Sequence, residues 1–195
     1  TLVPYMKTSD ELKTKPTQHS VQKLREIGIQ PDILLCRTEK KLSKAIKDKI
    51  ALFCNVESNS VITAMDVSSI YEVPLGLEKE GLCKIILEKL GMKGKSPDLE
   101  RWQKINQILK KPDGEVKIGI VGKYVDLKES YKSLTESLIH GGIGNNVRVI
   151  IDWVDAEALE KEDGSALLKS CDGVLVPGGF GDRGIEGKIK AVQFA

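Results

Sequence analysis

Hydrophobic and polar positions follow two different periods along the first half of the chain. Short apolar runs at Ile33–Cys36 and Val61–Met65 have the length of strands that are buried on both faces of a sheet. Apolar residues repeat at helical spacing in three stretches around these runs: 21–27, 46–53 and 82–90. The stretches end at residues typical of helix ends: Gly28, Asn55 and Gly91. Since Thr1–Val3 also resembles the end of a strand, the order predicts a parallel sheet with helices on its faces.

The same alternation starts again after residue 115. Apolar runs predict strands at three places: Val116–Val121, Val147–Ile151 and Gly173–Val176. The spacing predicts helices over three further stretches: 130–139, closed by Gly141 and Gly142, the largely helical 156–168, and one that begins near Glu186. Between the two halves the periodicity weakens, and only a short amphipathic helix around Trp102 and Leu109 is expected.

The fold class predicted is therefore α/β, with two doubly wound parallel-sheet domains. We place one domain at residues 1–91, a linker at 92–115 and the second domain at 116–195. The chain starts as if inside a strand, and residues 187–195 resemble a helix cut before its end. We therefore expect both domains to be incomplete in this chain.

Charge and composition exclude several classes of protein. The 195 residues carry a formal net charge of +2, which is not the basic footprint of a protein that grips nucleic acid. The apolar runs are too short for a transmembrane helix, and the first residues lack the layout of a signal peptide. Four cysteines form no CxxC pair and stand in apolar surroundings: Cys36, Cys54, Cys83 and Cys171. We interpret them as reduced core residues and expect a cytoplasmic protein without nucleic-acid or membrane partners.

The first candidate site is the polar segment before the first helix. It places two lysines, two hydroxyls and an amide within six residues: Lys13, Thr14, Lys15, Pro16, Thr17 and Gln18. We expect the helix to start near His19, because Pro16 disfavours a helical Lys15, and its positive end to favour an anion such as a polyphosphate. A solvated loop is the alternative. Lys49, in an apolar helical stretch, is a second candidate cation, or a lysine that reaches for water.

Two further candidates follow strands. Asp66, between Met65 and Val67, stands where ligands bind in parallel sheets and has the chemistry to accept from a ribose or base, although helix N-capping is the commoner role. The turn 177–181 contains three glycines that bring bare N–H groups together, either as an oxyanion site or as a structural turn before a helix. The segment 119–123 lacks the spacing of a P-loop. Neither Cys171 nor His140 stands in a turn suited to a nucleophile, so a catalytic nucleophile is expected outside this chain.

Taken together, these segments resemble the CTP synthase family. The resemblance is carried in order along the whole chain by Lys13–Ser20, Gly28–Asp32, Lys49–Val56, Val121–Tyr124 and the run Val176–Gly181 with Arg183 and Gly184. It implies the end of a P-loop-type amidoligase (synthetase) domain, followed by the start of a class I glutamine amidotransferase domain. It also implies a ligase that aminates UTP to CTP with ATP, Mg²⁺ and glutamine-derived ammonia, activated by GTP and assembled as a homotetramer.

The resemblance assigns roles to the candidates. Residues 13–18 and Lys49 would contact UTP and the inhibitor CTP, Met65, Asp66 and Val67 would flank ATP, and Gly179 would bind glutamine and supply an oxyanion-hole N–H. The magnesium ligands would precede residue 1, and the catalytic Cys, His and Glu would follow residue 195. By itself the chain is expected to be inactive. The alternative function is a non-catalytic pyrimidine-nucleotide sensor with a scaffold amidotransferase-like domain.

Overall fold

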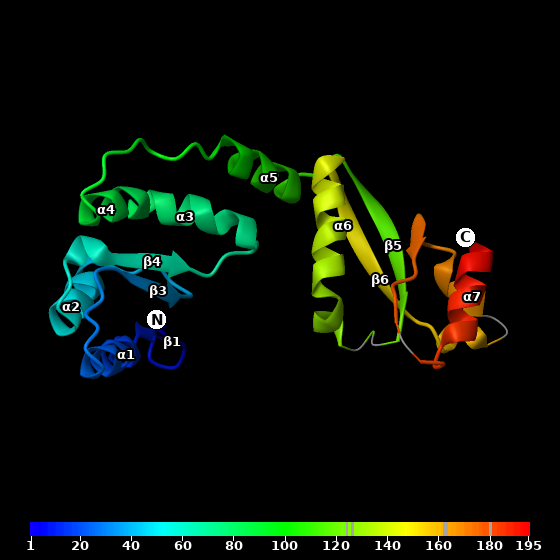
Figure 1. Ribbon diagram of the computed structural model, residues 1–195, viewed down its shortest axis with the longest axis horizontal. Helices are drawn as coiled ribbons and strands as arrows, with labels where there is room; N and C mark the ends of the chain where they lie inside the picture. The colour runs from blue at the N-terminus through cyan, green and yellow to red at the C-terminus, as the bar shows by residue number, and fades with distance from the viewer. Residues whose placement is uncertain (124, 126, 162–163, 180) are drawn as a thin grey trace. The chain divides into compact units, whose positions relative to one another are not determined.

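The chain forms two compact units, Thr1–Asn106 and Gln107–Ala195. The computed structural model describes residues 1–123, 125, 127–161, 164–179 and 181–195 (Figure 1). Tyr124 and Phe180, which belong to two of the motifs above, lie outside the described residues.

The first unit is built on a parallel pair of strands. β3 (Leu34–Thr38) pairs with β4 (Val61–Met65), so that Leu34 lies opposite Val61 and Thr38 opposite Met65. Leu2 forms a parallel bridge to Arg37, which confirms the strand-like character of the first residues. Val3, Cys36 and Val61 are fully buried, as expected of strands that are covered on both faces.

Helices cover both faces of this pair. In Figure 1, α3 and α4 lie on one side of β3 and β4, and α1 and α2 lie on the other. The helices of the unit are α1 (Lys15–Glu26), α2 (Lys44–Cys54), α3 (Val73–Lys79), α4 (Leu82–Lys89) and α5 (Glu100–Lys110), whose end passes into the second unit. Short 3₁₀ turns η1 (Ser58–Ser60) and η2 (Ile70–Glu72) flank β4. A core cluster joins Val21 of α1, Ile50 of α2 and Leu34 of β3.

Two sequence predictions for α1 are wrong. The helix begins at Lys15 rather than near His19, and Pro16 lies in its first turn. This is possible because a first-turn N–H has no partner within the helix, so its loss in proline costs nothing there. Ile27 was expected on the buried stripe but is 73% exposed, since α1 ends at Glu26 and the chain turns at Gly28 with φ +88°.

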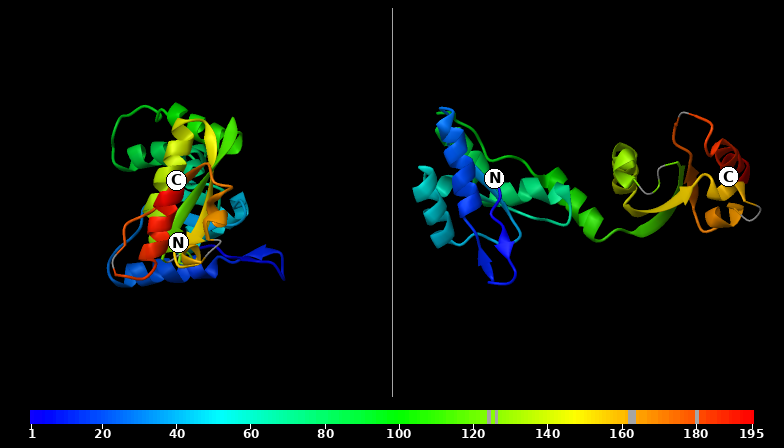
Figure 2. Two further views of the ribbon diagram at one scale, coloured as in Figure 1. Left: turned by 90° about the vertical axis from the view of Figure 1, so that its right-hand side faces the viewer. Right: turned by 90° about the horizontal axis from the view of Figure 1, so that it is seen from below.

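A short hairpin and the end of α2 complete the first unit. β1 (Tyr5–Met6) and β2 (Glu11–Leu12) pair antiparallel, and Figure 2 shows this hairpin, in dark blue, projecting from the unit. The hairpin was not predicted, because strands of two residues have no detectable period. α2 ends at Asn55 in the left-handed conformation with φ 55°, as the sequence predicted.

The second unit is a three-stranded parallel sheet. Its strands β5 (Gly114–Gly122), β6 (Val147–Asp155) and β7 (Gly173–Leu175) lie in the order β6-β5-β7. α6 (Lys132–Gly144), which follows η3 (Lys128–Tyr131), covers one face, and α7 (Ile185–Phe194) covers the other (Figure 1). The direction of winding therefore reverses at β5, and the carboxyl ends of β5 and β7 flank a topological switch point, where such sheets bind ligands.

Two helix predictions for this unit are wrong, one about where a helix ends and one about whether a helix forms. α6 was expected to end at Gly141 and Gly142 but runs through both, because Gly142 lies against β6: a Cβ there would meet the Val147 carbonyl oxygen at 2.7 Å. The segment 156–168 was expected to be largely helical but forms the 3₁₀ turns η4 (Ala158–Glu160) and η5 (Gly164–Leu168), with residues 162–163 outside the described part. The two turns bury Leu159 and Leu168 in one core cluster, which a straight helix would separate.

Candidate functional site

The predicted nucleotide segment joins the β1–β2 hairpin to α1. The Lys13 N–H donates to the Pro4 carbonyl at 2.9 Å, which fixes the strand-to-helix connection. Thr14 is the N-terminal capping residue, and Lys15–Gln18 form the first turn of the helix. The first-turn N–H groups lack partners within α1, and no acidic side chain stands in this turn, so the positive end of α1 is not neutralised by its own residues.

The two threonines of this segment are structural rather than exposed donors. Thr17 is fully buried, and its hydroxyl donates to the Leu2 carbonyl at 2.9 Å. Thr14 is also buried and accepts from the Gln18 side-chain amide at 3.1 Å. Lys13 and Lys15 are exposed. The structure thus separates the six predicted residues into a buried frame and a cationic outer face.

A carboxylate that the sequence analysis missed lies beside this face. Glu11 forms an ion pair with Lys13 and accepts a hydrogen bond from the Ser9 hydroxyl at 3.2 Å. The hydrogen bond from Lys13, its charge and then Ser9 lower the pKa of Glu11, and the charge of Lys49 on α2 acts in the same direction. Two lysines that are 36 positions apart in sequence (Lys13 and Lys49) therefore act on the same carboxylate.

This group lies at the carboxyl end of β3. The Asp10 carboxylate of the hairpin accepts from Tyr5 Oη at 2.6 Å and from Lys40 Nζ at 3.1 Å, and Lys40 also lies 3.7 Å from the centre of the Tyr5 ring. Lys40 lies two residues after the end of β3, so these contacts hold the hairpin at the edge where parallel sheets bind ligands.

Asp66 lies at the same end of the neighbouring strand, and it is not a helix cap. Its carboxylate pairs with Arg37 at 2.8 Å, and its N–H donates to the Thr38 carbonyl at 2.8 Å. The hydroxyl that accepts from the N-terminus of the next 3₁₀ turn belongs to Ser69 instead. Met65 and Val67, on either side, are 49% and 38% exposed. An acceptor between two exposed apolar side chains suits a nucleoside, which offers hydroxyl donors and a flat ring.

Thr38 connects Asp66 to the hairpin contacts: its carbonyl accepts from the Asp66 N–H at 2.8 Å, and its hydroxyl donates to the Lys40 carbonyl at 3.0 Å. Lys13 pairs with Glu11 and the charge of Lys49 also acts on that carboxylate, whereas Asp66 pairs with Arg37 at the carboxyl end of β4.

The glycine turn of the second unit lies at the switch point of its sheet. Lys123 follows β5 directly and is 7% exposed, and its ammonium donates to the Gly181 carbonyl at 2.5 Å. The Lys123 N–H donates to Tyr131 Oη at 3.2 Å, and its carbonyl accepts from Arg183 at 2.8 Å. Tyr131 approaches this closely because residue 122 is a glycine, whose Cβ would lie 2.6 Å from the phenol oxygen.

A second lysine meets the other end of the turn. Lys188 of α7 donates to the Pro177 carbonyl at 2.9 Å, and its Nζ lies 3.2 Å from the position that a Cβ on Gly179 would take. Burial and then the charge of Lys123 lower the pKa of Lys188. Gly178 and Gly179 are both exposed.

The cysteines and histidines form neither a nucleophile nor a metal centre within the described ranges. All four thiols are free, with Cys36 and Cys54 buried as predicted, whereas Cys83 and Cys171 are only half-buried. Burial raises the pKa of the Cys36 thiol to about 11 and also raises that of Cys171, which opposes thiolate formation. The part of the chain that the structure describes holds no cluster of three His, Cys, Asp or Glu side chains, and no helix in it is long and apolar enough to span a membrane.

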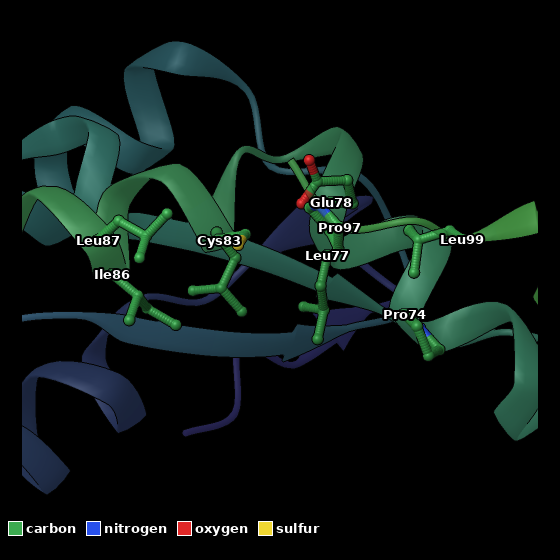
Figure 3. Close-up of a pocket in the computed structure, with 9 residues that line it drawn as sticks. Pro74, Leu77, Glu78, Cys83, Ile86, Leu87, Pro97 and Leu99 are labelled. Atoms are coloured by element: carbon green, nitrogen blue, oxygen red, sulfur yellow. The ribbon is translucent and has the colours of Figure 1, made fainter. Parts of the chain in front are cut away.

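An apolar pocket of about 270 Å³ lies in the first unit, between α3, α4 and the segment that follows them (Figure 3). Apolar side chains form most of its wall: Pro74, Leu77, Leu82, Ile86, Leu87, Pro97 and Leu99, with Cys83 and Glu78. This composition offers few polar groups to orient a nucleotide or an amino acid.

Three residues of the two sites were not assigned a role from the sequence. Glu11 has the sequence context of an ordinary surface acid, and Lys188 that of one more lysine on a helix. Lys123 belongs to a segment without P-loop spacing and to the run 121–124 that carries the family resemblance, but it received no role of its own. The contacts of Lys188 and Lys123 span 11 and 58 positions, so only the fold creates them, whereas Glu11 contacts a lysine two positions away.

Comparisons with known proteins divide the chain in the same order. Residues 1–92 match the family model described as CTP synthase N-terminus, and residues 126–195 match the one described as glutamine amidotransferase class-I. The CTP synthase of Geotalea uraniireducens (strain Rf4) is 61% identical over 196 residues, which cover 100% of this chain and 37% of that protein. The CTP synthase of Ruminiclostridium cellulolyticum is 57% identical and covers 100% of this chain and 36% of its own length.

One solved structure is also similar in sequence. The glutaminase domain of Trypanosoma brucei CTPS with bound acivicin is 41% identical and covers 40% of this chain and 31% of that chain, with a TM-score of 0.38. The chain thus spans 36–37% of the curated relatives described above.

Proposed function

Since this chain belongs to the CTP synthase family, we propose that it forms an inner part of an enzyme that aminates UTP to CTP with ATP and glutamine. The observation that carries the proposal is the succession of two different matches in one chain, an N-terminal CTP synthase segment and a class I amidotransferase segment. A shared amidotransferase part alone would fit several synthetases, whereas the first segment narrows the acceptor to a pyrimidine nucleotide.

The exposed cations of the first unit are the proposed binding site for UTP and its product CTP. Lys13, Lys15 and Lys49 would bind the triphosphate, with the positive end of α1 adding to the local potential. Pro16 would hold the first turn of α1, while Thr14, Thr17 and Gln18 would keep its backbone in place through the bonds described above. This role for the threonines comes from their burial and replaces direct contact as their main contribution.

The other proposed contacts lie at two separate places. Met65, Asp66 and Val67 would flank the adenosine of ATP, with the Asp66 carboxylate held by Arg37 while it accepts from a hydroxyl. Gly179 would bind glutamine and direct an N–H at the oxyanion that forms when the amide is attacked. That N–H stabilises charge that develops only in the transition state.

The remaining parts of the machinery are proposed to lie outside residues 1–195. By the family resemblance, the magnesium ligands, which accompany ATP, would precede residue 1, and the catalytic Cys, His and Glu would follow residue 195. We expect the chain by itself to catalyse neither half-reaction. Activation by GTP and a homotetrameric assembly remain predictions from the family resemblance, and a cytoplasmic location remains a prediction from the cysteines.

Equilibrium binding of UTP and CTP to the full-length protein tests the proposed nucleotide site. Lys13→Ala and Lys49→Ala should each lower the binding affinity for both nucleotides by about 10- to 100-fold, because each removes a charge-assisted contact of about 1.5–3 kcal/mol. Lys41→Ala removes an exposed lysine that lies in the loop before α2 and should leave both affinities unchanged. Unchanged binding in both test variants, or an equal loss in the control, would remove the assignment.

A further inference from the structure

The turn that presents Gly179 needs an anchor outside itself. The peptide between Pro177 and Gly178 rotates as a unit through one torsion on each side, and the glycine torsion is free to take either sign. Because the carbonyl and the N–H of a trans peptide point in opposite directions, such a rotation would turn the Gly178 N–H through the same angle. A turn made of glycines therefore does not by itself keep its N–H groups on one side.

The two ends of the turn are held by ammonium groups. At the far end, Lys123 donates to the Gly181 carbonyl at 2.5 Å. At the near end, Lys188 donates to the Pro177 carbonyl at 2.9 Å, and no other hydrogen bond among the described residues reaches that carbonyl. We propose that Lys188 is a positioning residue of the glutamine site, which holds the Pro177 carbonyl toward α7 so that the N–H groups of the turn face the substrate.

The surroundings of Lys188 support this role. Gly187, the residue before it, packs so closely that a Cβ there would lie 1.7 Å from the Ala156 carbonyl oxygen, so α7 has little room to shift. The ammonium lies 3.2 Å from the Cβ position of Gly179, close enough to add positive charge near the proposed oxyanion. Burial lowers the pKa of Lys188, which indicates that the group is partly removed from water.

The inference rests on the proposed function, and α7 offers a matched control for it. Lys190 lies two positions along the same helix and donates in the same way to a backbone carbonyl, that of Glu160, at 2.6 Å. Lys190→Met and Lys188→Met therefore remove the same kind of bond from the same helix, one away from the turn and one at it.

The test measures glutamine hydrolysis and ammonia-dependent CTP formation in the full-length protein. Lys188→Met should lower kcat for glutamine hydrolysis about 10- to 100-fold with the KM for glutamine nearly unchanged, because the N–H groups act mainly in the transition state. Ammonia-dependent CTP formation should be preserved, Lys188→Arg should recover most of the lost kcat, and Lys190→Met should resemble the wild type.

Each other outcome would overturn the inference. An unchanged kcat in Lys188→Met would show that the turn keeps its geometry without the lysine. Equal losses in both Met variants, or a loss of the ammonia-dependent reaction as well, would indicate general damage to the unit. A wild-type protein that forms CTP from ammonia but does not hydrolyse glutamine would overturn both this inference and the amidotransferase half of the proposed function.

Discussion

Two adjacent glycines of α6 should respond in opposite ways to substitution by alanine. A Cβ on Gly141 would meet no atom within 4 Å, whereas a Cβ on Gly142 would lie 2.7 Å from the Val147 carbonyl oxygen and 2.8 Å from Val149 Cγ2. The first position faces open space, and the second lies where α6 packs against β6. Gly142→Ala therefore has to push the helix from the strand or bend the strand.

The expected magnitudes follow from two contributions. Alanine favours a helix over glycine by up to about 1 kcal/mol, and this gain applies to both positions, although it is smaller near a helix end. Overpacking against backbone that cannot move away costs about 1–3 kcal/mol. Gly141→Ala should thus raise the free energy of unfolding of the unit slightly. The free energy of unfolding of Gly142→Ala should be about 1–3 kcal/mol lower than that of Gly141→Ala.

Tryptophan fluorescence makes this difference measurable in the second unit alone. The chain has two tryptophans, so Trp102→Phe leaves Trp153 of β6 as the reporter, with its ring 5.6 Å from that of Tyr131. In thermal unfolding, each kcal/mol should shift Tm by about 4–8 °C for a unit of this size. Equal Tm values for the two alanine variants, or a higher Tm for Gly142→Ala, would refute the close packing of α6 on β6.

Three further predictions concern a charge, an ion pair and a helix contact. Glu11→Gln should raise the affinity of the full-length protein for UTP and CTP about two- to five-fold, because the carboxylate no longer competes for Lys13; a titration that finds weaker binding contradicts this. Lys47→Met should lower the free energy of unfolding by about 1–3 kcal/mol at neutral pH, since it removes the 2.5 Å ion pair of the mostly buried Glu80. Burial alone would raise the pKa of Glu80, but the bonds from Lys47 and a backbone N–H lower it, so its contribution is full above the unfolded-state pKa and is lost as the pH falls through the folded-state value. The difference between wild type and Lys47→Met in urea unfolding should therefore vanish at low pH, and a constant difference would contradict it. Gly187→Ala should destabilise the second unit by about 3 kcal/mol and reduce glutamine hydrolysis, because its Cβ would overlap a backbone carbonyl oxygen; a Tm equal to wild type would contradict this.

The strands and most helices were predictable because burial leaves a pattern in the sequence. The strands Val61–Met65 and Gly173–Leu175 match the predicted apolar runs almost residue for residue, since strands covered on both faces need continuous apolar side chains. The β1–β2 hairpin left no such pattern, because its strands have two residues each and partly face water. The 3₁₀ turns η4 and η5 were predicted as one helix, because their apolar residues also fit a helical period.

The candidate sites were predictable as far as local chemistry identifies them. A lysine before a helix and three glycines after a strand are visible without the fold, and so Lys13 and Gly179 were found. Glu11 and Lys188 were not, because a surface acid and a helical lysine are ordinary until the fold places them against Lys13 and the Pro177 carbonyl. The structure therefore adds the neighbouring groups, Glu11 as the counter-charge of Lys13 and Lys188 as the donor to the turn, while the sequence already indicates Lys13 and Gly179.

CTP formation by the full-length protein tests the central claim most directly, with UTP and ATP present and either glutamine or ammonia as the nitrogen source. The wild type should form CTP from both sources, and Gly179→Val should form it from ammonia alone, because the substitution crowds the glutamine site beside Lys188 without touching the nucleotide site. Nucleotide binding without CTP from either source would contradict the account and favour a sensor, and equal loss of both activities in Gly179→Val would contradict the role assigned to the turn.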